Sequence, residues 1–425
     1  MPKHPFSELR RDKVENLKKL FGQSVAFLKW VLVALLVGGI CGVVGSLFHI
    51  CIDLVTELRM EHGWVIFLLP VGGLAIFFLY KLSKTKLDTN RVIESIRSEN
   101  DIPLIMAPLI FIGTVITHCV GGSAGREGAA LQLGGSIGYN IGCLFRFGKD
   151  ELHMIVMTGM SAFFAALFGT PLTAAFFALE VTSVGIMHYS GLVPCLVAAY
   201  GASTIAKLFR LSPVAFTLTT NVEFGAISSL QTAGVAIVAA IVSVLFCVSL
   251  EKGEHYMKKL VKRDWLRPII GGVLIIGLTI LVGNQNYNGA GMNVIESAMQ
   301  GKADIFAFVL KIVFTVITIA AGFKGGEIVP TFFIGSTLGC VVAPLFGLDP
   351  AFGAAIGFVA LFCGVVNCPV ASIILALEVF GVSNLPLLAI ACGISYMLSG
   401  NYSLYKSQKI MYSKFETKFI NAKTK

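Results

Sequence analysis

The sequence predicts an all-α membrane protein that crosses the bilayer several times and contains two copies of one unit. Its 425 residues are 56% hydrophobic and only 13% charged, whereas a typical soluble domain carries about 25% charged residues. Two stretches about two hundred residues apart repeat the same pattern of glycine, glutamate and proline. Such repeats, with Gly- and Pro-interrupted apolar segments at matching positions, are typical of transporters whose substrate site lies near the bilayer midplane.

The two copies keep the same landmarks in the same order. The first has Gly125-Arg126-Glu127-Gly128, then Gly135-Ser136, then Pro171 and Ala178-Leu179-Glu180-Val181. The second has Gly325-Gly326-Glu327, then Gly335-Ser336, then Pro369 and Ala376-Leu377-Glu378-Val379. In both copies the serine follows the first glutamate by nine residues, and the second glutamate follows the proline by nine. We therefore expect inverted repeats at roughly 26–210 and 231–400.

Apolar runs that can cross, or nearly cross, a hydrocarbon core of about 30 Å define the expected membrane segments. They lie at 26–50, 64–80, 103–120, 153–180, 188–207, 231–250, 268–283, 304–322 and 369–399. The runs 129–144 and 331–346 are shorter and rich in glycine, so we expect half-helices or tilted helices there. Residues 26–400 are thus expected to form one transmembrane domain with many tilted and broken helices.

The net charge of +9 comes from basic residues in the two ends and in a few loops, which does not indicate a nucleic-acid groove. Loop clusters occur at Lys81/Lys84/Lys86, at Arg146/Lys149 and within 258–267. The positive-inside rule places them in the cytoplasm. We expect a multi-pass protein of the plasma (inner) membrane with both ends cytoplasmic. Residues 1–25 carry no signal peptide in this interpretation, and 401–425 form a short segment without a soluble regulatory domain.

Neither the cysteines nor a serine motif indicates an enzyme. The ten cysteines lie in apolar segments without a CxxC pair, so we expect packing residues and no metal site or cofactor. Gly121-Gly122-Ser123-Ala124-Gly125 matches G-x-S-x-G with His118 nearby, which keeps an intramembrane serine hydrolase as a remote alternative. The same pattern recurs over 134–138, and neither copy has a strand–turn–helix context.

The Gly125–Gly128 loop is expected to open a helix inside the protein. Glycines let the backbone approach a ligand closely, and free N–H groups at the positive end of a helix dipole attract an anion. A carboxylate there can occupy the anion site itself and leave when it takes up a proton. We predict that Glu127 couples anion and proton movement, because an ionisable residue inside the membrane is costly and usually functional. The alternative is a cap paired with Arg126.

These motifs resemble those of the CLC family of anion channels and antiporters. Residues 122–128 are similar to its GREGP motif, with Ala129 in place of the proline, and residues 325–330 resemble its GGxFxP motif. Residues 169–172 and 367–370 resemble its paired N-x-P-L helix starts. The resemblance covers nearly the whole chain and implies a CLC-like inverted-repeat fold. It also implies Tyr405 as the central tyrosine facing the anion, and a homodimer with an interface at the helices that end in Glu180 and Glu378.

Departures from the common chloride-transporting pattern resemble the fluoride/proton antiporter branch. The family's serine loop is replaced by Leu87-Asp88-Thr89-Asn90, so Thr89 or Asn90 takes the serine's place, and the register stays open. Glu327 adds a carboxylate to the second motif, where Ile328 replaces an aromatic residue. Val181 stands where chloride/proton exchangers carry an internal relay glutamate. The predicted function is fluoride export driven by proton entry; a chloride/proton exchanger or a chloride channel is the alternative.

Fluoride chemistry suggests a role for Glu327. Fluoride is small and strongly hydrated, so its site needs strong, charge-assisted donors, and a protonated Glu327 would be one. The alternatives are a Lys324–Glu327 pair at i, i+3 and purely interfacial roles for Asn90 and Tyr405. The expected anion site comprises Gly125, Arg126, Gly128, Asn90, Thr89, Gly326, Glu327, Ile328, Val329 and Tyr405, gated by Glu127. The expected partners are fluoride or chloride, protons, the lipid bilayer and a second copy of the chain.

Overall fold

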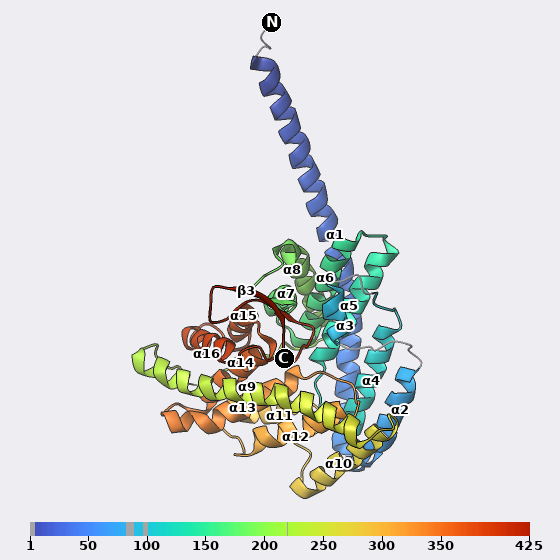
Figure 1. Cartoon of the computed structure of the whole chain (residues 1–425), viewed down its shortest axis with the longest axis vertical. Coiled ribbons are helices and arrows are strands. Elements are labelled where there is room, and N and C mark those ends of the chain that lie inside the picture. The colour runs from blue at the N-terminus through green and yellow to red at the C-terminus, as the bar shows by residue number, and fades with distance from the viewer. Residues whose placement is uncertain (1–4, 82–88, 97–100, 219) are drawn as a thin grey trace.

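The computed structural model describes residues 5–81, 89–96, 101–218 and 220–425, without the side chains of residues 5–15 and 17. Lys84, Lys86 and Asp88 lie outside the described residues. The protein is mostly helical (Figure 1). The first half contains α1 (Pro5–Glu61), α2 (Leu69–Lys81), α3 (Thr89–Ser95), α4 (Met106–Val120), α5 (Glu127–Leu144), α6 (Lys149–Phe168), α7 (Pro171–Glu180) and α8 (Leu192–Leu208). The second contains α9 (Ala226–Leu260), α10 (Leu266–Val282), α11 (Met292–Met299), α12 (Ala307–Ala320), α13 (Ile328–Val342), α14 (Pro350–Val366), α15 (Pro369–Phe380) and α16 (Leu385–Leu398).

The repeat predicted from the sequence is visible as two matching runs of helices. The order α4, α5, α6, α7 in the first half corresponds to α12, α13, α14, α15 in the second. In each run the glycine–glutamate landmark lies where the second helix begins, and the proline opens the fourth. The glycine–glutamate and proline landmarks therefore mark the starts of equivalent helices.

Glycines bring the second and third helices of each run into backbone contact. A Cβ at Gly134 would lie 2.2 Å from the Gly159 carbonyl oxygen, and a Cβ at Gly335 would lie 2.3 Å from that of Gly357. Close helix approach through small residues is a main source of helix association in membranes. The glycine-rich runs 129–144 and 331–346 thus belong to the continuous helices α5, of 18 residues, and α13, of 15 residues. Of the two alternatives expected for these runs, half-helices or tilted helices, the continuous α5 and α13 agree better with the second.

Two expected spans divide into two helices each. The run 153–180 breaks at Gly169, whose φ of 75° ends α6, before Pro171 begins α7. The run 369–399 breaks between α15 and α16. Helix α14 was absent from the expected spans, although the cap residue Asp349, Pro350 and Asn367 mark its two ends in the sequence. Asn367, at φ 57°, ends α14 in the left-handed conformation.

Each repeat caps a helix of the other. The Glu378 carboxylate, near the end of α15, accepts hydrogen bonds from Leu172 N–H at 3.0 Å and Thr173 N–H at 2.8 Å, at the start of α7. The Glu180 carboxylate, at the end of α7, accepts from Val370 N–H at 3.3 Å and Ala371 N–H at 2.9 Å. The end of each helix therefore lies beside the start of the other, as an inverted repeat requires.

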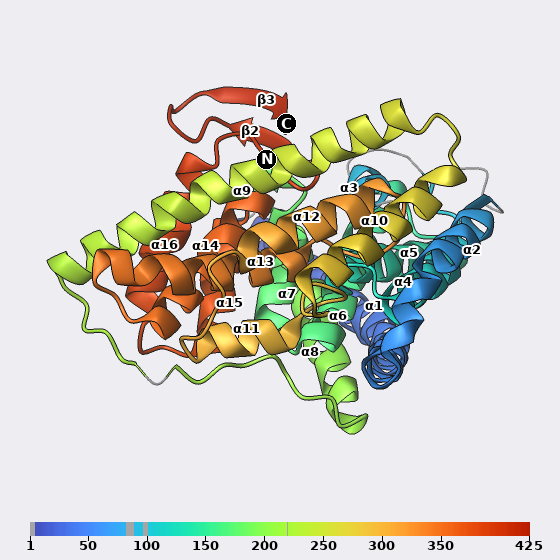
Figure 2. The same ribbon diagram turned by 90° about the horizontal axis from the view of Figure 1, so that it is seen from below.

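A small sheet was not predicted. Strand β1 (Ser183–Val184) pairs in parallel with β2 (Lys409–Tyr412), which pairs antiparallel with β3 (Phe419–Lys423). Figure 2 shows the β2–β3 hairpin at one edge of the helical body, beyond α9. The hairpin fixes the segment that contains Tyr405 against the end of α7.

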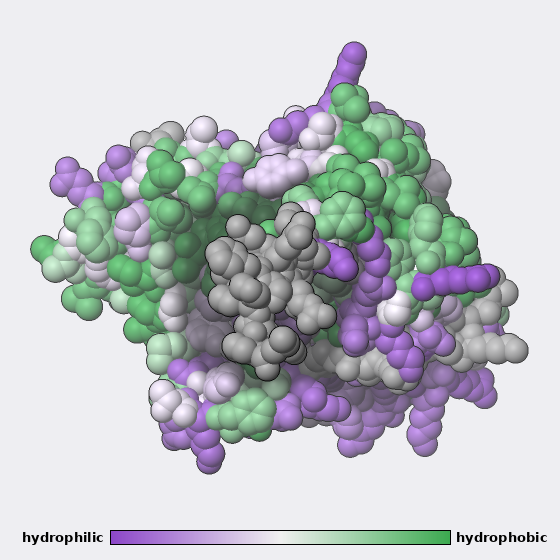
Figure 3. Space-filling model, turned by 90° about the horizontal axis from the view of Figure 1, so that it is seen from above, coloured by the Kyte–Doolittle hydropathy of each residue, from purple (hydrophilic) through white to green (hydrophobic). Residues whose placement is uncertain are grey.

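The helices and the surface are those of a membrane protein. Six described segments are long and apolar enough to cross a bilayer: Lys18–Glu61, Gly63–Lys81, Lys149–Phe168, Tyr189–Leu208, Ala226–Leu260 and Ile328–Phe346. Large apolar side chains are exposed on them, such as Leu32 on α1 and Ile241 on α9. Figure 3 shows apolar residues over much of one face, with hydrophilic residues gathered along its lower border.

Candidate functional site

The two glycine–glutamate loops contact each other back to back. Gly125 N–H donates to the Gly326 carbonyl oxygen and Gly326 N–H to that of Gly125, both at 2.7 Å. A Cβ at Gly326 would lie 2.2 Å from Gly128 N. Only glycines allow this approach, so the conserved spacing of the landmarks in the two copies has a physical reason. Helices α5 and α13 both start from this junction.

Glu127 is buried at the first turn of α5, with 2% of its surface exposed. Its Oε2 accepts from Arg126 N–H at 3.1 Å, and its Oε1 lies 3.5 Å from Arg126 Nε. The carboxylate therefore takes a backbone N–H at a helix N-terminus, which is the type of group that binds anions. These contacts are those of the alternative interpretation, a cap paired with Arg126, and the coupling role of Glu127 stays a prediction.

Arg126 is held from a helix outside the loop. Its guanidinium donates to Asp53 of α1 at 3.1 Å, and the other oxygen of Asp53 lies 3.2 Å from His49 Nε2. The sequence analysis missed this link. Asp53 is an ionisable residue within a long apolar run, and that signal could have identified it.

Two further buried cations support the loops beside this junction. The Lys311 ammonium, fully buried in α12, donates to the carbonyl oxygens of Gly289 at 2.7 Å and Tyr287 at 3.2 Å. Arg59 donates to the His118 carbonyl at the end of α4. Cations are stabilised at helix C-termini and by carbonyl oxygens. These residues brace the loop 287–289, whose Gly289 N–H donates to Gly122.

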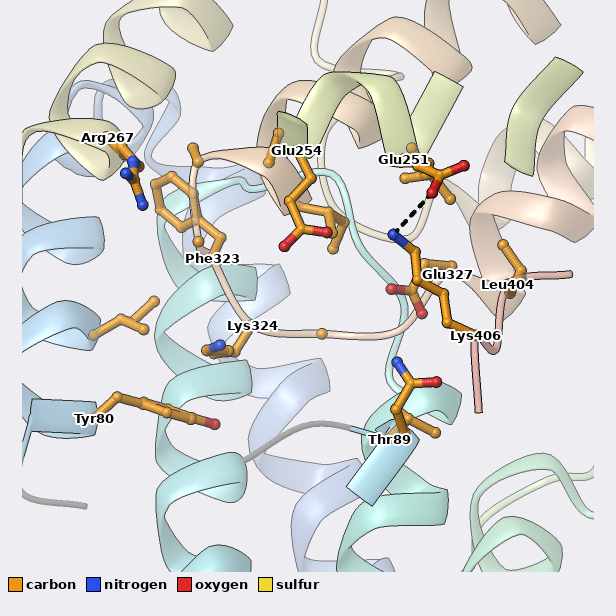
Figure 4. A pocket seen from close by; sticks show the side chains of 18 of the residues that line it. Tyr80, Thr89, Glu251, Glu254, Arg267, Phe323, Lys324, Glu327, Leu404 and Lys406 are labelled. Atoms are coloured by element: carbon orange, nitrogen blue, oxygen red, sulfur yellow. Dashed lines mark hydrogen bonds and ion pairs between the residues drawn. The ribbon is translucent and has the colours of Figure 1, made fainter. Parts of the chain in front are cut away.

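A cavity of about 780 Å³ borders the second loop of the junction, where Gly325 and Glu327 line it. Glu327, the N-cap residue of α13, lines it together with Tyr405, Thr89 and Asn90. Glu327 is half-buried, whereas Glu127 is not among the described residues that line the cavity. Figure 4 shows Glu327 and Lys406 converging on this space from different segments. The cavity therefore brings together predicted residues from both repeats and from the C-terminal segment.

Some polar groups at this cavity have hydrogen-bond partners in the protein, and one, the Tyr405 hydroxyl, has none among the described residues. Thr89 Oγ1 accepts from Gln132 Nε2 at 2.8 Å, and Asn90 Oδ1 accepts from Ser407. The Tyr405 hydroxyl is buried without a hydrogen-bond partner among the described residues. A buried hydroxyl without a partner is costly, and it suits a group that binds a mobile ligand.

A cation–ring contact and an ion pair lie among the residues that line the cavity. The Lys324 ammonium lies 4.4 Å from the centre of the Tyr80 ring, and Lys406 Nζ lies 3.4 Å from Glu251 Oε1 on α9, as the dashed line in Figure 4 marks. Six basic and four acidic side chains line the whole cavity. Its charge is therefore net positive, which favours entry of an anion.

Ile328 and Val329 have packing contacts rather than polar ones. Both are buried, and a Cβ at Gly125 would lie 2.8 Å from the Val329 Cβ. Their backbone N–H groups belong to the first turn of α13, so any anion contact would come from the backbone.

The serine motif lacks hydrolase geometry. Ser123 Oγ lies 3.0 Å from Thr315 Oγ1, and His118 Nδ1 contacts the Thr114 carbonyl oxygen. The motif occupies the turn between two helices, without the strand of a nucleophile elbow. Serine hydrolysis is not supported at this place.

Comparisons with known proteins agree with this geometry. The sequence profile described as "Voltage gated chloride channel" matches residues 72–400. A "Chloride/fluoride channel protein" of Pseudomonas syringae pv. tomato is 38% identical over 91% of this chain and 87% of its own length. The chain belongs to the CLC family. The resemblance inferred from the four motifs is thereby confirmed.

Solved CLC structures share the fold. A "CLC-type fluoride/proton antiporter" has a TM-score of 0.86 and 34% identity, covering 90% of this chain and 98% of the other. A "slow cyanobacterial Cl-/H+ antiporter" has a TM-score of 0.77 at 20% identity, covering 87% and 94%, and shows the fold alone. An "H(+)/Cl(-) exchange transporter ClcA" of Yersinia pestis is 27% identical over 64% of this chain and 60% of its own length. The predicted all-α CLC architecture is confirmed.

Proposed function

We propose that this CLC protein is a fluoride/proton antiporter that exports fluoride as protons enter. The observation that carries the proposal is Glu327, a carboxyl at the repeat-matched position of Glu127, which lines one cavity with Asn90 and Tyr405. The 38% identical relative named for chloride and fluoride and the similar fluoride/proton antiporter structure support the same reading.

The cavity is proposed as the cytoplasmic entrance. Its lining includes Lys81, Lys258 and Arg267, which belong to basic clusters that the positive-inside rule assigns to the cytoplasm. A net positive lining concentrates anions at the mouth. Fluoride would then meet Asn90, Glu327 and Tyr405, whose N–H and O–H groups replace the water that the ion loses.

Glu327 would act as a donor only when protonated. A carboxylic acid donates an O–H to fluoride, whereas the carboxylate repels it, so fluoride binding here favours the form that carries a proton. Release of that proton removes the donor. This reciprocal dependence is a form of proton–anion linkage, and an apolar or amide side chain at the same position would lack it.

Glu127 would provide the second proton step. Its carboxylate takes the Arg126 N–H at the start of α5, and protonation would weaken this charge-assisted hydrogen bond. When the neutral side chain leaves, the N–H groups of the helix start become available to the anion. Anion and proton would thus use the position alternately, which favours exchange over simple conduction.

The test is anion efflux from liposomes that contain the purified protein. Fluoride and chloride electrodes would measure the two fluxes, and a pH-sensitive dye would follow proton entry. Proton uptake driven by an outward fluoride gradient supports the proposal. Faster coupled transport of chloride than of fluoride would instead assign a chloride/proton exchanger, and chloride flux without proton movement would assign a channel.

We further propose a homodimer in the plasma membrane with both ends of the chain cytoplasmic. The resemblance to the family suggested an interface at the helices ending in Glu180 and Glu378. Of these, α15 exposes Val370, whereas most of α7 is covered by its own chain, so α15 is the better candidate. Light scattering of the detergent-solubilised protein would measure the mass, and cysteine labelling of residue 425 from either side of sealed vesicles would test the orientation.

A further inference from the structure

The side chain of Asn90 is held by the C-terminal segment of the chain. Ser407 N–H and Ser407 Oγ–H both donate to Asn90 Oδ1 at 3.0 Å, across 317 residues of sequence. Ser407 comes two residues after Tyr405, and Asn90 and Tyr405 both line the cavity. The contact therefore joins two of the predicted anion ligands through a third residue.

This contact decides which end of the carboxamide faces Ser407. A backbone N–H can only donate, so the atom that it meets must be the carbonyl oxygen and not the NH2 group. The amide nitrogen, which carries two N–H donors, consequently points away from Ser407. If the hydroxyl contact is lost, one of the two hydrogen bonds from Ser407 to the carboxamide remains.

Ser407 is itself fixed by its neighbour. Gln408 is fully buried, and its Nε2 donates to the carbonyl oxygens of Val181 and Val366, both at 2.8 Å. Its Oε1 accepts from Ser403 Oγ at 2.9 Å and Asn367 Nδ2 at 3.1 Å. All four contacts join the segment to ends of helices or to its own turn. Ser407 thus presents its two donors from a rigid support.

We propose that Ser407 is a positioning residue for anion selectivity, which holds the Asn90 carboxamide with its N–H donors turned toward the anion. An amide in the opposite orientation would present its oxygen, an acceptor, and an acceptor repels an anion. A small, strongly hydrated anion loses more from this reversal than a large one, because it depends more on strong donors. The inference rests on the proposed function, since it needs Asn90 to face transported fluoride.

The experiment compares three variants in liposomes by the ratio of fluoride to chloride efflux. Ser407→Ala removes the hydroxyl donor and should lower the ratio about three- to tenfold, the range expected for loss of one hydrogen bond. Ser407→Thr keeps the hydroxyl and should retain the wild-type ratio. Ser413→Ala is the matched control and should leave the ratio unchanged, because among the described residues Ser413 Oγ accepts hydrogen bonds from Phe415 and Glu416 of the same hairpin turn.

A double-mutant cycle with Asn90→Ala separates positioning from general damage. If Ser407 acts through Asn90, adding Ser407→Ala to Asn90→Ala changes the ratio no further. An unchanged ratio in Ser407→Ala, or an equal fall in both backgrounds, overturns the inference. If Ser407→Ala does not fold, Ser407→Cys replaces it, since a thiol is a weaker donor: a ratio below that of Ser407→Thr supports the inference, and an equal ratio overturns it.

Failure of the proposed function gives a different result. Wild-type protein that does not couple fluoride to protons would reject the proposed function before any variant is compared. Wild-type fluoride exchange together with an Asn90→Ala effect, but with no effect of Ser407→Ala, rejects the positioning role alone.

Discussion

The loops that open α5 and α13 share a backbone arrangement but place their glutamates in different surroundings. The two loops are joined by a pair of backbone hydrogen bonds between Gly125 and Gly326, one in each direction. Glu127 is shut into the protein against Arg126, whereas Glu327 borders the cavity. The repeat thus gives two carboxyl groups at equivalent backbone positions with unequal access to water. Unequal access is what a transporter needs if protons are to bind and leave on different sides.

The largest effect is expected from a change of the buried glutamate, Glu127. Glu127→Gln keeps the shape of the side chain but cannot bind and release a proton, so uphill proton movement driven by a fluoride gradient should fall to the level of empty liposomes. A pH-sensitive dye inside the vesicles measures it. Proton pumping at the wild-type rate would remove Glu127 from the coupling mechanism.

The second largest effect is expected from a change of Glu327, the glutamate that lines the cavity. Glu327→Ala removes a charge-assisted donor, so fluoride/proton exchange should fall on the order of 10- to 100-fold. The amount of folded dimer should change little, because a partly exposed ion pair contributes no more than about 1 kcal/mol. Glu416→Gln, at an exposed position in the hairpin turn, is the control.

Glu327→Gln sharpens the same test, because an amide donates a hydrogen bond but releases no proton. Retained fluoride binding with lost exchange would assign proton carriage to Glu327. Wild-type exchange in both variants would leave the residue a structural role and return the protein to a generic CLC anion transporter.

The third effect concerns the backbone symmetry itself. Gly326→Ala would place a Cβ 2.2 Å from Gly128 N, so the loops must separate, at a cost of about 1–3 kcal/mol for an overpacked site. We expect a lower melting temperature and impaired transport together. Gly39→Ala, at a position in α1 with no atom within 4 Å of the new methyl group, should leave both unchanged. A Gly326→Ala variant as stable as wild type would mean that the junction is not tightly constrained.

The smallest effect is expected from Asn90, and it concerns the selectivity between fluoride and chloride. Asn90→Ser replaces a fixed amide donor by the hydroxyl that the chloride-transporting pattern carries, and should raise chloride flux relative to fluoride by about three- to tenfold. Parallel efflux measurements with both anions give the ratio. Asn221→Ser, at an exposed position between α8 and α9, provides the comparison. An unaltered ratio in folded Asn90→Ser protein would transfer the role to Thr89 or away from α3.

The sequence was most informative where function depends on local spacing. The glycine–glutamate loops lie where α5 and α13 begin, and Pro171 and Pro369 are the first residues of α7 and α15. The register between Thr89 and Asn90 stayed open, because the residues that hold them, Gln132 and Ser407, are 43 and 317 positions away. Contacts of this kind depend on tertiary packing and produce no repeating pattern in the sequence.

The C-terminal hairpin was not predicted either, because it also depends on contacts between distant parts of the chain. Its strands are short, and their exposed positions mix the aromatic residues Tyr412 and Phe419 with the polar residues Asn421 and Lys423, so no regular polar–apolar alternation separates them from a loop. They are ordered by Gln408 and by pairing with β1, which lies more than two hundred residues earlier. Asp53 could have been predicted, because a carboxylate within an apolar run indicates a functional or paired residue. Its partner in the structure is Arg126.

The exchanged caps of α7 and α15 impose an order on biosynthesis. Thr173 is made 205 residues before the Glu378 that accepts from it. At a synthesis rate of roughly 5–20 residues per second, the start of α7 waits about 10–40 s for its acceptor. Helix α15 does not wait, because Glu180 is already in place when Val370 and Ala371 emerge. The cap of α15 can thus form as soon as that helix is made, whereas the cap of α7 is completed only after the second half of the chain is made.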